Sequence, residues 1–436
     1  MRLAPRILLA VLATALVAGA VPASAVSERE TTAIHITVTV ALDERRVIPI
    51  GIDHGADWGD VILESGTAKA AALGSGTFLR RGMAFGDRRL GTQDTFQMSF
   101  PAGDLVFQGD SFWYGPTEVA LLGGTGDFSG VRGSASVTLG EGTQEWIISI
   151  LPQRGVDATR TTVLEYPREL RSTSRITLAP EGSTVGNLTQ TLGVLVGTDE
   201  RTVADYTAIS TVVQDMPGNR ERRLVQAMFA FQDDATFVGN IFLNSIIVAE
   251  RGALPTSPVS YAISGGTGIY AGAAGVAEYV PGNGTSADRW RFTLFALTDR
   301  ATPVPIKAAT QIETRYTQVR TSGTAQGGVG DLVLAGGWGR SGKAERDHWA
   351  VSAQAVDIAA GRESVRRTLL ATLQYAQGPD RLLVLGLTRT GTAGGPAAPV
   401  ERVVIGGLGA YAGASGTSTM TPVKPRQWRT TFAVSR

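Results

Sequence analysis

A glycine-rich segment of eleven residues occurs three times in the chain at almost equal spacing. It reads GGTGDFSGVRG at 123–133, GGTGIYAGAAG at 265–275 and GGLGAYAGASG at 406–416. Five glycines and one aromatic residue hold the same places in every copy, and the copies start 142 and then 141 residues apart. Such regular self-similarity predicts three copies of one structural unit, each about a third of the chain.

The sequences on both sides of the glycine segment repeat as well. Trp146, Trp290 and Trp428 each follow it and begin a run with the pattern of a β-strand: WIISIL, WRFTLFAL and WRTTFAV. Upstream, each copy has two apolar runs separated by a turn, which is typical of a β-hairpin. We therefore predict that the three tryptophans occupy equivalent positions at the start of the last strand of each unit.

Strand patterns dominate the rest of the chain. Apolar and polar residues alternate in IHITVTV at 34–40, and no segment sustains the 3.6-residue period of a helix. Units of about 135 residues built from many short strands fit closed antiparallel barrels, because closure removes exposed edges. The prediction is an all-β protein with three tandem barrels at 26–155, 156–302 and 303–436, arranged about a pseudo-threefold axis.

The glycines of the repeated segment have two interpretations. Consecutive glycines permit positive φ at a tight turn, and the later ones allow a strand to bend where it rounds a barrel corner. A phosphate-binding loop is the alternative, but no Lys-Ser/Thr pair and no helical pattern follow the glycines. The turn interpretation is therefore favoured.

The first 25 residues have the three parts of a secretory signal peptide. Arg2 and Arg6 are basic, residues 7–21 are apolar, and Ala23-Ser24-Ala25 is a small-residue cleavage site. The alternative is a retained membrane anchor, but the apolar run is shorter than the ~20 residues that a span needs. We predict cleavage after Ala25, a secreted protein and no stable membrane insertion.

Charge and composition exclude several kinds of partner. Without the leader the chain has 38 Lys and Arg against 39 Asp and Glu, so no basic surface for nucleic acid is expected. There is no cysteine, which excludes disulfides and thiolate metal sites. The three histidines are dispersed and lack the spacing of metal ligands. We expect neither a metal nor another cofactor.

The glycine segment and the hairpin before it resemble the dirigent proteins and, more broadly, the allene oxide cyclase-like barrel family. GGTGDFSGVRG at 123–133 is very similar to the dirigent hairpin near the end of that domain, and FQMSFPAGDLVFQGDSF at 96–112 corresponds to its Phe-rich strand pair. The glycine-rich Gly74–Phe78 fits an upstream strand. The segment matches well in the first two copies and less well in the third, where Leu408 replaces Thr.

This resemblance implies eight-stranded antiparallel barrels with a ligand cavity. Dirigent proteins associate as trimers and direct the stereochemistry of phenoxy-radical coupling, and their relatives cyclise or dehydrate bound substrates. Three such units on one chain would then be a covalent version of that trimer, which implies a monomer that acts as a pseudo-trimer.

The resemblance also points to Asp127 and Arg132 as catalytic residues, because dirigent proteins use an Asp and an Arg around the cavity. A carboxylate in an apolar cavity has a raised pKa, and a guanidinium can hold an anion at two points. Only the first copy carries both residues; the others have Ile269 with Ala274 and Ala410 with Ser415. The alternative for Asp127 and Arg132 is a solvent-facing ion pair across a hairpin.

Trp113 and Tyr114 are candidates for binding a ring-bearing ligand, with core packing as the alternative. The predicted function is a secreted dirigent-like barrel protein that binds a small hydrophobic or phenolic molecule and directs its stereoselective cyclisation or coupling. The alternative is a non-catalytic array of barrels that binds small ligands or acts at the cell surface. The sequence leaves open whether the protein is an enzyme.

Overall fold

A computed structural model describes most of the chain after residue 32. The described residues are 33–49, 58–85, 92–111, 117–140, 142–151, 156–179, 181–234, 236–283, 286–297, 303–304, 306, 308–319, 331–340, 346–360, 365–377, 380–390 and 398–435. The predicted leader at 1–25 and the ligand-binding candidates Trp113 and Tyr114 lie outside these residues.

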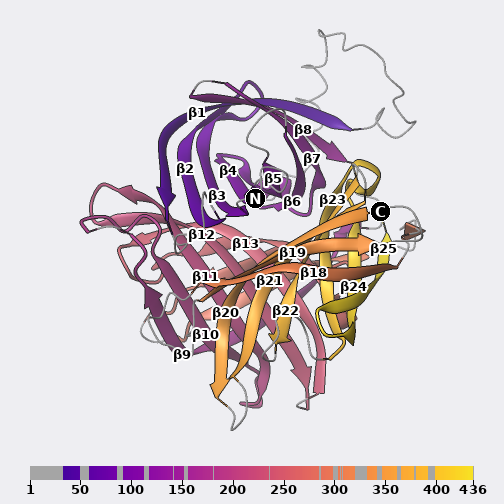
Figure 1. Ribbon diagram of the computed structural model, residues 1–436. Helices are drawn as coiled ribbons and strands as arrows, with labels where there is room; N and C mark the ends of the chain where they lie inside the picture. The colour runs from indigo at the N-terminus through magenta and orange to yellow at the C-terminus, as the bar shows by residue number, and fades with distance from the viewer. Residues whose placement is uncertain are drawn as a thin grey trace.

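The first unit is a closed barrel of eight antiparallel strands in chain order, seen at the top of Figure 1. Strand β1 pairs with β8 and closes the ring. The strands are β1 Ile34–Ile48, β2 Trp58–Ala70, β3 Gly74–Phe85, β4 Thr92–Phe100, β5 Gly103–Ser111, β6 Thr117–Gly124, β7 Arg132–Leu139 and β8 Thr143–Leu151.

The second unit is also a closed barrel of eight strands, in which β9 pairs with both β10 and β16. Its strands are β9 Val156–Ile176, β10 Leu188–Val196, β11 Thr202–Met216, β12 Arg220–Asp233, β13 Thr236–Glu250, β14 Val259–Gly266, β15 Gly275–Val280 and β16 Arg289–Leu297. All described pairings are antiparallel, so the all-β prediction is confirmed.

The third unit is a nine-stranded sheet in the order β17-β25-β18-β19-β20-β21-β22-β23-β24. Strand β25 also pairs with β24. The strands are β17 Pro303–Val304, β18 Ala309–Val319, β19 Leu332–Arg340, β20 Arg346–Ala360, β21 Val365–Gln377, β22 Asp380–Thr390, β23 Val400–Leu408, β24 Ser415–Lys424 and β25 Gln427–Ser435.

The two-residue alternation of the sequence fills the barrels. In β1 the side chains of Ile36, Val38 and Val40 are buried and the residues between them are exposed, because successive side chains of a strand point to opposite faces. Trp146, Trp290 and Trp428 are buried in β8, β16 and β25, which confirms their predicted place in the last strand of each unit.

The repeated glycine segment forms a short 3₁₀ turn in every unit: η3 Gly126–Phe128, η4 Gly268–Tyr270 and η5 Gly409–Tyr411. The first residue of each turn is a glycine with φ between +57° and +61°, a conformation that other residues seldom adopt. Each turn thus depends on a glycine, as predicted, but this glycine is the fourth residue of the segment and not one of the consecutive glycines at its start.

The first glycine of each segment lies at a contact between units, and at Gly265 and Gly406 there is no room for a larger side chain without a shift. A methyl group on Gly123 would lie 3.5 Å from Ala262 in the second unit. One on Gly265 would lie 2.6 Å from Val403 in the third, and one on Gly406 would lie 2.8 Å from Leu122 in the first. The contacts therefore run from first to second, second to third and third to first unit.

Strands β6, β14 and β23, which carry these glycines, contact one another pairwise. The apolar cluster between them draws residues from all three units. Its members are Val106, Ala120, Leu122, Ile209, Met228, Phe242, Ala262, Leu383, Leu385, Val403, Ile405 and Leu408. A shared core of this kind holds the units together without disulfides.

Candidate functional site

The two predicted catalytic residues, Asp127 and Arg132, lie in different environments. Asp127 is exposed in the η3 turn. Arg132 begins β7 with its side chain outside the barrel, because Ala135 and Val137 of that strand face inward and faces alternate. Its Nη2 donates to the carbonyl oxygen of Ser264 in the second barrel at 2.9 Å.

Arg132 is thus a contact between barrels, and burial lowers the pKa of its guanidinium to about 10. No ion pair joins it to Asp127 in the part of the chain that the structure describes. The sequence suggested that Asp127 and Arg132 either share a cavity or form an exposed ion pair. The two side chains do neither. Their catalytic role stays a prediction that this arrangement does not favour.

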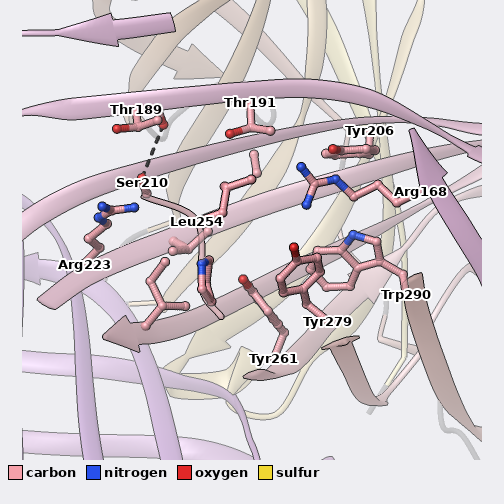
Figure 2. Close-up of a pocket in the computed structure, with 14 residues that line it drawn as sticks. Arg168, Thr189, Thr191, Tyr206, Ser210, Arg223, Leu254, Tyr261, Tyr279 and Trp290 are labelled. Atoms are coloured by element: carbon pink, nitrogen blue, oxygen red, sulfur yellow. Dashed lines mark hydrogen bonds between the residues drawn. The ribbon is translucent and has the colours of Figure 1, made fainter. Parts of the chain in front are cut away.

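A cavity of about 50 Å³ lies inside the second barrel instead. All eight strands of the barrel, β9 to β16, line it, and Leu254 and Pro255 line it from the loop between β13 and β14. Figure 2 shows Arg168 and Arg223 at opposite ends of this space, with Tyr206 on one side of Arg168 and Tyr279 and Trp290 on the other. The cavity volume is enough for a few water molecules or a small chemical group.

Aromatic side chains make most of one end of the cavity. The centroid of the Trp290 ring lies 4.9 Å from that of Tyr261 and 5.5 Å from that of Tyr279. Burial raises the pKa of Tyr206, Tyr261 and Tyr279 above that of a free phenol. These phenols therefore stay neutral at physiological pH and present apolar rings with polar tips.

Arg168 of β9 reaches into this aromatic end with a side chain only 4% exposed. Its guanidinium carbon lies 5.5 Å from the Tyr206 ring centroid and 5.3 Å from that of Tyr279. Nη1 pairs with Oδ2 of Asp288 at 3.3 Å. The other two nitrogens, Nε and Nη2, are buried and have no hydrogen-bond partner among the described residues.

Asp288, the ion-pair partner of Arg168, has a side chain that is 32% exposed. Its carboxylate accepts hydrogen bonds from the Tyr279 hydroxyl at 2.7 Å and from the Gly282 backbone N–H at 2.8 Å. Burial alone would raise the pKa of Asp288, but these two donors and Arg168 outweigh it and lower the pKa. Asp288 is thus ionised and a weak base.

Arg223 at the other end of the cavity has all its polar partners in the protein. It pairs with Glu221, and its Nη1 and Nη2 donate to the carbonyl oxygens of Ala253 and Glu250 at 2.8 and 3.1 Å. Glu221 also accepts from the Gly252 backbone N–H at 3.1 Å. This pair therefore fixes the start of the loop that carries Leu254 and Pro255.

The first barrel also has an arginine inside, but one that is fully paired. Arg80 bonds to Asp94 through Nε at 2.8 Å and to Glu64 through Nη1 at 3.1 Å, and its Nη2 donates to Asp94 and Thr92. Burial opposes the charge, yet the two carboxylates raise the pKa of Arg80 above its usual value. The described residues leave this guanidinium no free edge.

Sequence reasoning missed the site because Arg168 occurs in a charged stretch, EYPRELRSTSR, that looks solvent-exposed. Alignment of the repeated units could have identified Arg168 as an interior residue. Trp146 pairs with Val38, and Trp290 pairs with Tyr166. Two residues further along the same face, the first unit has Val40 inside and the second has Arg168.

Comparisons with known proteins identify no family. No protein-family model matches the chain, and no curated protein matches it. Among solved structures, a pyocyanin demethylase is similar at 19% sequence identity, with a TM-score of 0.26 over 30% of this chain and 99% of the demethylase chain. This likeness is too weak to carry an argument about fold or function.

The described residues contain no cluster of three or more His, Cys, Asp or Glu that could hold a metal ion. They also contain no helix of the length and apolarity required to cross a membrane.

Proposed function

We propose that this protein is a secreted, dirigent-like barrel protein that binds a small hydrophobic, ring-bearing molecule at the cavity of its second barrel. The observation that carries the proposal is the cavity at Arg168, which has an aromatic wall and buried polar donors without partners. Such a combination of apolar surface and few oriented polar groups is typical of small-molecule sites.

Two versions of this function differ in what happens to the ligand. In the first, the barrel orients a phenolic or unsaturated molecule so that it couples or cyclises stereoselectively. In the second, the barrel only binds. The lowered pKa of Asp288 and the raised pKa of the three tyrosines favour a site without strong acid–base catalysis, so orientation or simple binding is the better-supported role.

We also propose that the third unit closes as a barrel equivalent to the other two, so that one chain acts as a covalent pseudo-trimer. Strand β25 pairs with both β18 and β24, the pattern that joins the last strand to the first in a ring. The cyclic glycine contacts and the shared apolar cluster support a pseudo-threefold arrangement. We propose on this basis that the chain acts as a monomer, and we propose from its near-zero net charge that it has no nucleic-acid partner.

The binding proposal is tested by filling the cavity. Ala208 of β11 lines it, so Ala208→Leu should occupy the space and weaken binding of a ring-bearing probe such as 3-phenylpropanamide at least tenfold by calorimetry. Ile269→Leu is the matched control, because Ile269 is 71% exposed outside the barrels. Equal affinity of both variants would refute the site.

A ligand that is recovered unchanged after prolonged incubation would favour the binding-only version. A product enriched in one stereoisomer, formed by the wild type and not by Ala208→Leu, would favour coupling or cyclisation.

A further inference from the structure

The free edge of Arg168 defines the ligand more closely. Building on the proposed binding function, we infer that the ligand is a ring-bearing carboxylic acid whose carboxylate is held at two points by Nε and Nη2 of Arg168. The inference rests on the geometry of this guanidinium, on the polar atoms around it and on the size of the cavity.

The unused nitrogens of Arg168 are the pair that suits a carboxylate. In a guanidinium, Nε–H and one N–H of Nη2 point in the same direction and match the two oxygens of a carboxylate. Asp288 takes only Nη1, on another edge. Figure 2 shows the guanidinium between the Tyr206 and Tyr279 rings. A carboxylate in the plane of the guanidinium would therefore also lie between these two rings.

The polar atoms around this edge are donors that lack an acceptor. Arg168 Nε and Nη2 are donors, and so is the indole Nε1 of Trp290, which is buried without a partner among the described residues. The Tyr206 hydroxyl lies close enough to Arg168 for the guanidinium to offset part of the effect of burial on the Tyr206 pKa, but it makes no well-formed hydrogen bond with a described residue. A buried charged donor without an acceptor is costly, and an ionised carboxylate is the group that only accepts.

The charge on Arg168 is only partly neutralised by the protein. Asp288 is about a third exposed, and two other donors share its carboxylate. Arg223 is occupied by Glu221, and the tyrosines are neutral because their pKa is raised. The cavity side of Arg168 therefore keeps a positive potential that favours an anion over a neutral group.

The cavity volume places the two ends of the ligand. A cavity that holds benzene measures about 150 Å³, three times the 50 Å³ found here. The space at Arg168 thus accommodates a carboxylate and the first carbons of its chain, not a ring. The ring is placed toward Leu254 and Pro255, which line the cavity from a loop that is partly exposed.

The test compares an acid with its neutral amide: 3-phenylpropanoate and 3-phenylpropanamide, titrated into the intact protein. Wild type should bind the acid at least tenfold more tightly. Arg168→Met should weaken acid binding about 30-fold and amide binding less than threefold. Arg168→Lys should restore little, because an ammonium group lacks the two parallel donors.

A second variant gives a change of the opposite sign. Asp288→Asn removes a competing negative charge and leaves the free edge of Arg168 in place, so acid binding should become about threefold tighter. A purely structural role for Arg168 and Asp288 predicts weaker binding in both variants.

Three outcomes would overturn the inference: equal wild-type affinity for acid and amide, equal losses of both in Arg168→Met, or weaker acid binding in Asp288→Asn. Binding of the amide alone would reject the carboxylate and keep the proposed function. Failure of both probes to bind the wild type would reject the proposed function as well.

Discussion

The first and second barrels share a frame and differ in what they bury. Trp146 and Trp290 occupy equivalent positions, so the strand pairings that start from them give the equivalent residues of the two barrels. By these pairings, Glu64 and Arg80 of the first barrel correspond to Thr191 and Ala208 of the second. The second barrel has its charged side chains at other positions: Arg168, where the first barrel has Val40, and Arg223 at the other end of the cavity. The two barrels therefore carry their charged interior residues at different positions of the same frame.

The difference shows how the same residue type serves structure in one place and recognition in another. Arg80 has two carboxylates and a threonine around it, and its hydrogen bonds close within the protein. Arg168 has one partly exposed carboxylate and keeps an open edge toward a cavity. Both arginines are buried, so burial alone does not distinguish the structural Arg80 from the proposed ligand-binding Arg168. The hydrogen-bond partner of each N–H group does distinguish them.

The largest effect is expected from removing the paired arginine. Arg80→Met leaves Glu64 and Asp94 buried without their counter-charge and should lower the free energy of unfolding by about 3–5 kcal/mol. Arg168→Met is the matched control and should cost about 1 kcal/mol or less, because Asp288 is partly solvated and keeps two other donors. Denaturant unfolding measures both, and similar losses would contradict the comparison.

The second-largest effect, on ligand affinity, is expected when charged interior residues of the first barrel are introduced into the second barrel. Thr191→Glu, Ala208→Arg and Val225→Asp together place the charges of Glu64, Arg80 and Asp94 at the corresponding positions. The added side chains should fill the cavity and lower 3-phenylpropanoate affinity at least 100-fold, about 2.7 kcal/mol. Calorimetry gives the result, and retained binding would place the ligand elsewhere.

A smaller effect should appear only at alkaline pH. Burial raises the pKa of Tyr261 in the folded protein, so its stabilising contribution is complete below the unfolded value of about 10 and is lost as the pH rises above it. At pH 11 the loss should be about 1.4 kcal/mol for one such tyrosine. Tyr261→Phe should therefore show a shallower alkaline decline in unfolding free energy, while an unchanged decline would contradict the buried phenol.

The smallest effect is expected at the residue that sequence reasoning favoured. Asp127→Asn alters an exposed turn outside both interiors and should change the free energy of unfolding by less than about 0.5 kcal/mol. It should leave 3-phenylpropanoate binding unchanged in calorimetry. A large loss of binding or turnover would restore Asp127 as a functional residue.

The architecture was largely predictable because it depends on repeated, local signals. Alternating residues such as Ile36 and Val38 identify strands, and Trp146, Trp290 and Trp428 mark the last strand of each unit. The glycines with positive φ, such as Gly126, were equally readable, since the conformation restricts the residue type. The contact role of Gly123 was not readable, because it depends on a neighbour 139 positions away, Ala262.

The candidate site was not predictable in the same way. Whether Arg132 points into a barrel or out of it depends on a register of one residue, and it points out, toward Ser264. Arg168 was hidden by its charged sequence neighbours, which face the other side of β9. Its free edge also depends on Tyr206, Tyr279 and Asp288, which come together only in the closed barrel.

The cyclic glycine contacts have a consequence for how the assembly responds to dilution. Separate chains that met through Gly123, Gly265 and Gly406 would associate and dissociate according to their concentration. On one chain the same contacts are intramolecular, with an effective concentration in the millimolar range. Each unit then always meets the same two neighbours, at any total protein concentration. A substitution on one contact face of a unit then needs a compensating substitution in only one other unit. The residues inside the three units do not take part in these contacts, so they are free to differ from one unit to the next.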